Sequence, residues 1–378
     1  MKWIRSDWGK GFLARLFRRL MKNWAWVVLV LLVIPIRIAS SYPAWVEKYY
    51  TYGFYPVVSS VLRRVVGWVP FSLGDLFYGA ILLLIIFKTG WLFKDLWTKK
   101  VDRAYWVSGL QQFIFVFVFL YVFFNLLWGL NYNRKGIGYQ LGIQTDSATV
   151  AELDTLTNLL LEKANYYGTL EEAGIRKDLH RKKNLFSQAV EGYKKASLQY
   201  PFLKYSNQSV KPSLYSYAGN YLGFQGYYNP FSGEGQVNTT IPIFVQPFVA
   251  SHELAHQLGY AKESEANFVG FLAAKEHPSN FFRYSAYLDM YLYAHAQLYF
   301  ADSARASQIR TKASVQVKKD IQELRHFYRR YQTPLEEWVT VGYDYFLQAN
   351  QQPQGKKSYG QVTGWLLAWV RKMGWEAL

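Results

Sequence analysis

Residues 251–268 read SHELAHQLGYAKESEANF, and the segment HELAH (252–256) within them is an instance of the pattern H-E-x-x-H. Residues four apart on a helix lie on one face, with Cβ atoms about 5–6 Å apart. His252 and His256 can therefore offer two imidazole nitrogens to one metal ion. Glu253 is one step round the helix, where a carboxylate can act as general base toward a water at the metal. The alternative interpretation is a helix with two core histidines.

The residues after HELAH can complete such a site. Gly259 is a natural helix terminator, and the next segment restarts a helix that brings Glu263 and Glu265 back toward the histidines. The chain has no cysteine, so a zinc ion could be bound only by His, Asp or Glu, and a catalytic zinc takes three such ligands. Either glutamate could be the third ligand. The spacing E-x-x-x-N favours Glu263, because it puts Glu263 and Asn267 on one helix face.

The first third of the chain contains three long apolar stretches, at about 24–40, 71–93 and 106–130. About 20 apolar residues suffice for a helix to cross the hydrocarbon core of a bilayer, and Trp and Tyr lie at the ends of these stretches, as at membrane interfaces. The sequence therefore predicts three transmembrane helices in a membrane domain over residues 1–130. A cleaved signal peptide is the alternative for the first stretch. The long basic segment before it and the two apolar stretches after it argue against cleavage.

Basic residues are concentrated next to these stretches. The formal net charge is +17, residues 1–22 carry seven Lys or Arg, and the loop 94–103 is also basic. Because Lys and Arg mark cytoplasmic ends, we expect a cytoplasmic N-terminus and an extracytoplasmic domain over residues 131–378. No nucleic-acid-binding motif accompanies the charge, so no nucleic-acid partner is expected.

The remaining segments indicate a mainly α fold. The loop 41–70 reads as an amphipathic segment that either lies on the outer membrane face or packs against the domain that follows. Beyond residue 131, helical patterns cover 147–168, about 176–199 and most of the chain from 248, while 200–240 is rich in Pro, Gly, Ser and Tyr. We expect an α-rich (α+β) domain with a small sheet, and helix breaks near Gly259, at 277–278 and over 348–360.

HELAH followed by E-x-x-A-N resembles the gluzincin type of zinc peptidase. This resemblance implies a zincin-like fold, a Zn²⁺ cofactor, Glu263 as third ligand and Asn267 as a supporting residue. The sequence departs from the pattern in one respect, because only six residues separate His256 from Glu263.

Zincins also have an edge strand that pairs with an extended peptide substrate. Residues 236–244 alternate, and Pro242 would be tolerated only on an edge, so this stretch is a candidate for binding peptide by strand addition. A hairpin packed on the helices is the alternative. The candidate substrate-binding residues are Gly235, Gln236, Val237 and Asn238. Candidate donors to a developing oxyanion are Tyr343, Tyr345, Tyr359, His295 and His326.

The whole layout resembles an uncharacterised family of bacterial multi-pass membrane proteins, domain of unknown function 3810. The matching features are the basic N-terminus, three spans ending in WGLNYNR, then GYYNPFSGEGQVN, PFVASHELAHQLG, ESEANF and a late SYG. The resemblance implies a zinc peptidase in the bacterial plasma membrane, acting on a peptide or protein in the cell envelope. The alternative function is a non-catalytic receptor or scaffold, or a signal sensor, with a structural zinc or none.

Overall fold

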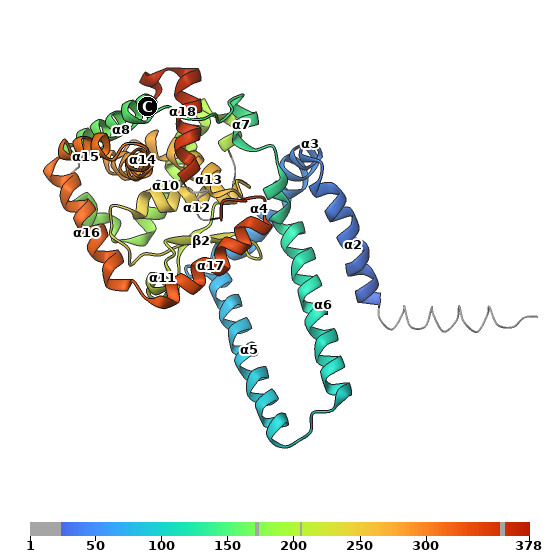
Figure 1. Ribbon diagram of the computed structural model, residues 1–378. Coiled ribbons are helices and arrows are strands. Elements are labelled where there is room, and N and C mark those ends of the chain that lie inside the picture. The colour runs from blue at the N-terminus through green and yellow to red at the C-terminus, as the bar shows by residue number, and fades with distance from the viewer. Residues whose placement is uncertain (1–23, 171–173, 205, 356–359) are drawn as a thin grey trace, which may run out of the picture.

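The computed structural model describes residues 24–170, 174–204, 206–355 and 360–378. It is mainly helical, with one three-stranded sheet, which confirms the expected fold class at that level. A rounded body carries two long helices that project from one end of it (Figure 1). The basic segment 1–22 and the candidate Tyr359 lie outside the described residues.

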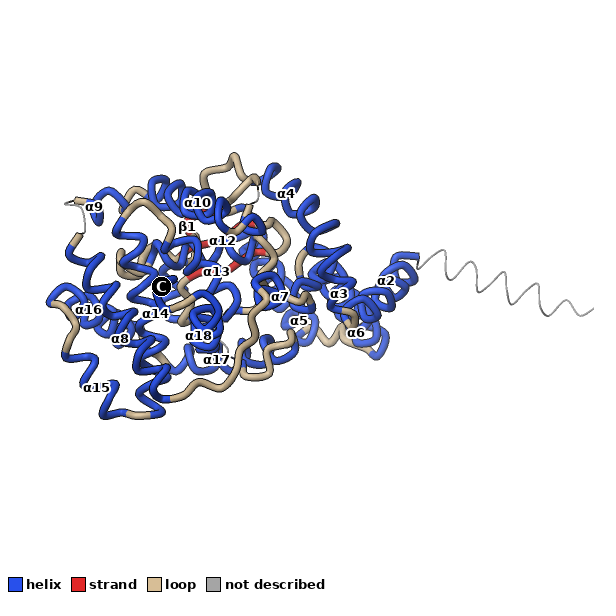
Figure 2. The backbone as a smooth tube through the Cα atoms, turned by 90° about the horizontal axis from the view of Figure 1, so that it is seen from above, coloured by secondary structure: helices blue, strands red, loops and turns tan. Residues whose placement is uncertain are grey.

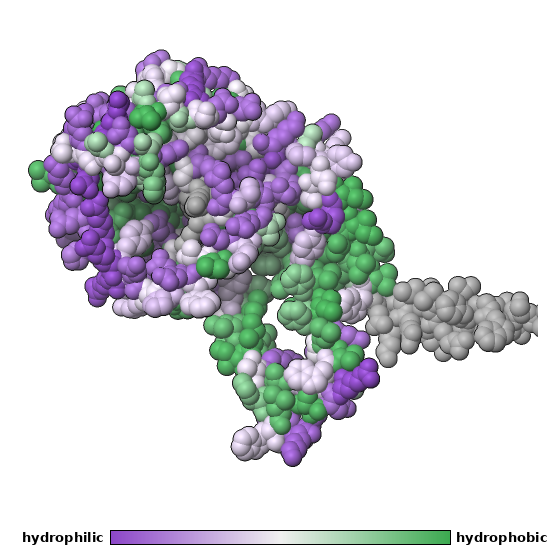
Figure 3. Space-filling model, in the orientation of Figure 1, coloured by the Kyte–Doolittle hydropathy of each residue, from purple (hydrophilic) through white to green (hydrophobic). Residues whose placement is uncertain are grey.

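The two projecting helices are α5 (Leu73–Trp97) and α6 (Arg103–Leu127), and both are long and apolar enough to cross a membrane. Apolar side chains cover their surfaces (Figure 3), and Leu83 and Phe113 are each more than two thirds exposed. The helices begin at capped residues: the side chain of Ser72 accepts a hydrogen bond from the Asp75 N–H, and that of Asp102 accepts one from the Tyr105 N–H. Such a surface suits a lipid environment.

The first apolar stretch forms α2 (Trp24–Ser40), which packs beside α6 through an edge-to-face contact of Trp26 with Phe115. After a break the chain bends by 100° into the helical segment Pro43–Val66. A third candidate span exists only if this bent pair counts as one.

The loop 41–70 proves to be helical over most of its length and packs against the body. It contains α3 (Pro43–Trp45), the π-helix η1 (Val46–Phe54) and α4 (Tyr55–Val66). One face is buried in a small apolar core, whereas Val57, Val61 and Val65 on the other face are exposed. The segment contributes Val46, Tyr50 and Tyr55 to this core. Buried members from the rest of the chain include Val122, Trp128, Leu130, Tyr132 and Ala261. The sequence left two interpretations of the loop 41–70 open, and its buried face agrees with the second, packing against the body.

The larger core lies among the helices of the body. The helix α8 (Val150–Thr169) begins with a capping box of Thr149 and Glu152 and packs along α14 (Asn280–Ala301). The remaining helices of the body are α7 (Gly136–Leu141), α9 (Ile175–Leu179), α10 (Lys182–Gln199), α11 (Ser216–Leu222), α12 (Gln246–Gln257), α13 (Glu263–Lys275), α15 (Ser303–Thr311), α16 (Val315–Tyr331), α17 (Pro334–Ala349) and α18 (Val362–Met373). The predicted breaks are present, and three further ones precede α15, α16 and α17; Asp302 and Ser314 cap α15 and α16.

The sheet contains β1 (Val210–Pro212), β2 (Gly226–Asn229) and β3 (Glu234–Val237) in the order β1-β3-β2. It lies near the centre of the body against α12 (Figure 2). Because β3 pairs in parallel with β1 and antiparallel with β2, the expected edge strand over 236–244 is wrong. Strand addition needs unpaired backbone groups, and β3 has partners on both sides. Beyond Val237 the chain turns away from the sheet toward α12. The residues expected to bind substrate on that edge, Gly235, Gln236, Val237 and Asn238, are buried.

A buried ion pair joins η1 to the body. Arg134 contacts the two oxygens of Glu47 through its Nη2 and Nε atoms, at 3.0 and 3.2 Å, and neither side chain is more than 4% exposed. Glu47 also accepts a hydrogen bond from the Lys135 N–H, and the Arg134 guanidinium lies over the Tyr260 ring. The pair therefore links the membrane-proximal segment to the chain just after α12.

We predict that Arg134→Met lowers the free energy of unfolding by about 3–5 kcal/mol, because the substitution leaves Glu47 buried without its partner. The matched control is Arg371→Met, which breaks a partly exposed pair with Glu152 and should cost about 0–1 kcal/mol. Unfolding of the detergent-solubilised protein, followed by tryptophan fluorescence, measures both. Equal losses for the two variants would show that the buried pair has no special weight.

Candidate metal centre

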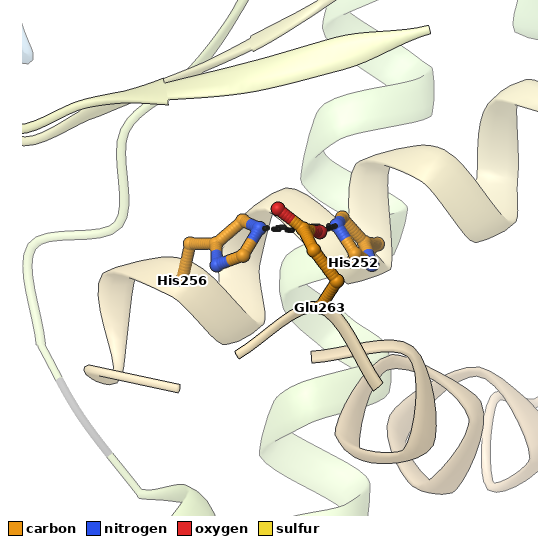
Figure 4. A group of neighbouring side chains, drawn as sticks. All are labelled: His252, His256 and Glu263. Atoms are coloured by element: carbon orange, nitrogen blue, oxygen red, sulfur yellow. Dashed lines mark hydrogen bonds and ion pairs between the residues drawn. The ribbon is translucent and has the colours of Figure 1, made fainter. Parts of the chain in front are cut away.

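Two histidines and one glutamate converge at the centre of the body. His252 and His256 lie one turn apart on α12, and Glu263 is the first residue of α13 (Figure 4). The two Nε2 atoms are 3.0 Å apart, and Glu263 Oε2 lies 3.2 Å from that of His252 and 3.5 Å from that of His256. All three side chains are buried, and their ligand atoms could hold one metal ion. The structure thus brings together the three residues expected as ligands.

The turn between α12 and α13 explains how Glu263 returns after only six residues. Gly259 has a φ of +86°, a conformation that glycine adopts without strain. Its N–H donates to the His256 carbonyl, and the Tyr260 N–H donates to the Ala255 carbonyl. These two bonds form a Schellman motif, which ends a helix sharply. The short gap that departs from the gluzincin pattern is therefore compatible with a three-residue centre.

Three side chains from the segments next to α5 and α6 bind the carbonyls at the end of α12. The Tyr55 hydroxyl donates to the Gln257 carbonyl at 2.9 Å, and Trp128 Nε1 donates to the His256 carbonyl at 3.1 Å. Arg134 donates to the Leu258 carbonyl at 3.4 Å. The last carbonyls of a helix lack partners within it, so these three contacts fix the histidine-bearing helix.

Neighbouring groups orient both imidazoles. His256 Nδ1 lies 2.7 Å from the Tyr260 carbonyl, and since a carbonyl only accepts, Nδ1 carries a proton and leaves the Nε2 lone pair for a metal. Asn267 lies beside His252, and the two side chains interact. The backbone of α13 can approach the backbone of α12 closely because residue 270 is glycine. A Cβ there would lie 3.0 Å from the backbone nitrogen of His252. Asn267 thus occupies the supporting position expected for it.

The charges of the centre favour a cation. Burial lowers the pKa of His252, and Glu263 and Asn267 only partly oppose this. Burial would raise the pKa of Glu263, but the imidazoles hold it well below its usual range. For His256 the effect of Glu263 outweighs burial and raises the pKa to about 9. A proton shared between His256 and Glu263 thus stabilises the centre, and a divalent ion in its place would do the same more strongly.

Glu265 does not join this group. Its carboxylate accepts a hydrogen bond from the Ile137 N–H at 3.1 Å and lies 3.8 Å from Lys262 Nζ. It therefore points toward the start of α7, while Glu263 points toward the histidines. Of the two glutamates that the sequence left open, the structure brings Glu263 to the centre.

The centre lies on the wall of a cavity of about 750 Å³. His252 and Glu253 both face it, and it extends as far as Tyr78 and Leu82 of α5. Aromatic and apolar side chains supply most of the lining, and Figure 3 shows a hollow with apolar walls between α16 and α17. Three ligands and one face toward a cavity are the arrangement of a catalytic zinc site.

Glu253 is packed at the edge of this cavity beside the sheet. Its carboxylate fits against Gly226 of β2, where any Cβ would collide with Oε1. Burial raises the pKa of Glu253 to about 8. Its buried Oε2 has no hydrogen-bond partner in the part of the chain that the structure describes. A carboxyl group held in this way is suited to exchange a proton with a molecule in the cavity.

One of the expected oxyanion donors reaches the centre. The Tyr343 hydroxyl donates to Glu263 Oε1 at 2.8 Å, and Tyr343 also lines the cavity. Tyr345 and His326 are exposed, and His295 Nε2 contacts the Ala306 carbonyl away from the cavity. Asp289 and Tyr293 of α14 also line the cavity, and the sequence did not predict either as a site residue. Within a long apolar helix, nothing in the sequence shows which residues face a cavity.

We predict that Glu263→Gln abolishes stoichiometric metal binding, whereas Glu265→Gln retains it, because the amide still accepts the Ile137 hydrogen bond. Each purified variant receives a slight excess of divalent metal, and the unbound metal is then removed. Elemental mass spectrometry measures the metal that remains bound to the protein. Loss of metal from the Glu265 variant alone would reverse the assignment. His326→Ala, an exposed histidine, controls for adventitious binding and should keep the wild-type stoichiometry.

In the comparison with protein families, a family described as "Protein of unknown function (DUF3810)" matches residues 50–367. No curated protein and no solved structure matches the chain significantly. The matched region includes α4, α5, α6 and the whole metal centre.

Proposed function

Because the chain belongs to the DUF3810 family of proteins of unknown function, we propose its function from the site itself: a membrane-anchored zinc metallopeptidase. One observation carries the proposal. Three buried ligand residues lie together, and one of them, His252, lines the same cavity as Glu253. The His₂Glu donor set has no thiolate and fits a catalytic zinc. The zincin-like character of the body is part of this proposal.

A zinc ion held by His252, His256 and Glu263 would polarise a peptide carbonyl and lower the pKa of a water toward about 7. Glu253 takes the proton from the attacking water and delivers it to the leaving amine. Tyr343 holds the Glu263 carboxylate in place through its hydroxyl, and its side chain forms part of the cavity lining. The apolar walls hold the peptide and keep bulk water away from the reacting groups.

The proposed topology has three spans, with α2 as the first, a cytoplasmic N-terminus, and residues 131–378 outside the cytoplasm of a bacterial plasma membrane. The helix α17 supports a location close to the bilayer. It lies at the end of the body from which α5 and α6 project (Figure 1), and Leu335, Trp338 and Tyr345 on one of its faces are exposed. An apolar helical face beside membrane spans is typical of an interfacial helix. The substrate would then be a peptide or protein of the cell envelope.

The rival proposal is a receptor or scaffold with a structural zinc. Structural sites are usually closed by four ligands, and the metal-binding group among the described residues has three. Glu265, the nearest further carboxylate in sequence, has a separate partner. The open position therefore favours the peptidase.

We predict that Glu253→Gln binds zinc with wild-type stoichiometry but loses peptide hydrolysis by at least about 10²-fold, because the amide cannot accept the proton. The measurement combines zinc analysis with mass-spectrometric detection of peptide cleavage in detergent. Undiminished hydrolysis by this variant would eliminate Glu253 as the base. Zinc that binds tightly with no hydrolysis by the wild type, across a broad peptide library, would favour the receptor.

We further predict that Tyr343→Phe lowers hydrolysis or zinc affinity by about 10–100-fold, because Glu263 loses the hydrogen bond that orients it. The matched control is Tyr345→Phe, two residues along the same helix but 70% exposed, which should behave as wild type. Steady-state kinetics and zinc titration of both variants test this. Identical behaviour of the two variants would mean that the Tyr343 hydroxyl has no role.

A further inference from the structure

The cavity contains a second carboxyl group that the metal centre does not use. Asp289 lies on α14, one turn before Tyr293, and lines the same cavity as Glu253. Its carboxylate has no ion pair and no hydrogen bond with any residue that the structure describes. Its side chain is half-buried because it faces the cavity.

The surroundings of Asp289 are apolar and aromatic. Glu253 and Asp289 are the two acidic residues of the lining, and the described lining includes no Lys or Arg. Burial raises the pKa of Asp289 to about 7, and no cation offsets this effect. A half-buried carboxyl group with no cation beside it among the described residues is costly, so this arrangement suits a group whose partner arrives with a ligand.

Tyrosines flank this carboxyl group. Burial and then the nearby Asp289 raise the pKa of Tyr293, and Asp289 also contributes to the raised pKa of Tyr328. Both tyrosines line the cavity. A cation beside Asp289 would therefore meet a carboxylate together with aromatic rings, which attract cations through their faces.

A short series of contacts connects the metal centre to the part of α14 that carries Asp289. Asn267 interacts with His252 on one side and with Tyr293 on the other. One helical turn, about 5.4 Å, separates Tyr293 from Asp289 along α14. A peptide bond at the metal would thus place a neighbouring part of the substrate within reach of Asp289.

We propose that Asp289 is a specificity residue of the cavity that binds a cationic group of the peptide substrate close to the scissile bond. This inference rests on the proposed peptidase function. The cation is an ammonium or guanidinium group, and it can be supplied by the free N-terminus or by a Lys or Arg side chain. The rest of the bound segment is apolar, to match the walls.

The test is a set of matched peptides that differ only in the cation. One arm compares a free with an acetylated N-terminus, and the other compares Lys with norleucine at each position near the cleaved bond. We expect the wild type to prefer one cationic series by at least about tenfold in kcat/KM. Asp289→Asn should reduce that preference to within about twofold while zinc content and hydrolysis of neutral peptides stay within about twofold of wild type.

Two further variants separate charge from structure. Asp289→Glu retains the charge and should retain a preference for cations. Glu323→Gln removes an exposed carboxylate from α16 and should leave the preference unchanged. A preference that survives in Asp289→Asn overturns the assignment. So does an equal loss of activity on every peptide, because that result would mean a role in folding or in the reaction itself.

Binding measurements separate this inference from the proposed function. Fluorescence anisotropy compares the same labelled peptides on Glu253→Gln protein with and without Asp289→Asn. Cation-dependent binding that requires Asp289, in a protein whose wild type cleaves no peptide, would sustain the subsite and reject the peptidase. Hydrolysis of cationic and neutral peptides at equal rates by the wild type would reject the subsite and leave the peptidase standing.

Discussion

The metal centre depends on the way the C-terminal end of α12 is buried. The last carbonyls of any helix need donors from elsewhere, and here Tyr55, Trp128 and Arg134 provide them. All three belong to segments that directly precede or follow the candidate membrane helices. The histidine-bearing helix therefore reaches its final position only when these segments are folded against it. These contacts pack the segments next to the projecting helices and the metal centre into one unit.

Burial of acidic groups is the second constraint. Glu253 and Asp289 line one cavity without Lys or Arg among its described lining residues, and Glu263 lies beside His252 on the wall of that cavity. A protein that needed only a stable core would gain by replacing such groups with apolar side chains. Perturbed carboxyl groups concentrated in a cavity are typical of functional sites. Each of the three has a distinct environment: Glu263 faces two imidazoles, Glu253 faces the sheet and the cavity, and Asp289 faces aromatic rings.

Sequence reasoning succeeded where the geometry is local. His252, His256, Glu263 and Asn267 lie within 16 residues, so helical spacing and one glycine turn place them together. It failed where partners are distant. The central position of β3 depends on β1, a strand that contains a proline and is only three residues long, too short to be predicted from its pattern. For the segment 41–70, an amphipathic pattern looks the same whether its apolar face meets lipid or protein. Asp289 lines the cavity only because of the way α14 packs in the body, and no local sequence pattern predicts that packing.

The walls of the cavity and its acidic groups imply different contributions to recognition. Apolar walls discriminate weakly between side chains of similar size, because one methylene changes binding by only about 1–3 kcal/mol. An unpaired carboxylate discriminates strongly, since a ligand without a cation leaves Asp289 desolvated and without a partner. The cavity would therefore accept many apolar sequences, and the charge next to the cleaved bond would decide which of them is processed. Selectivity of this kind needs no large interface, because a single charge contact next to the metal centre supplies it.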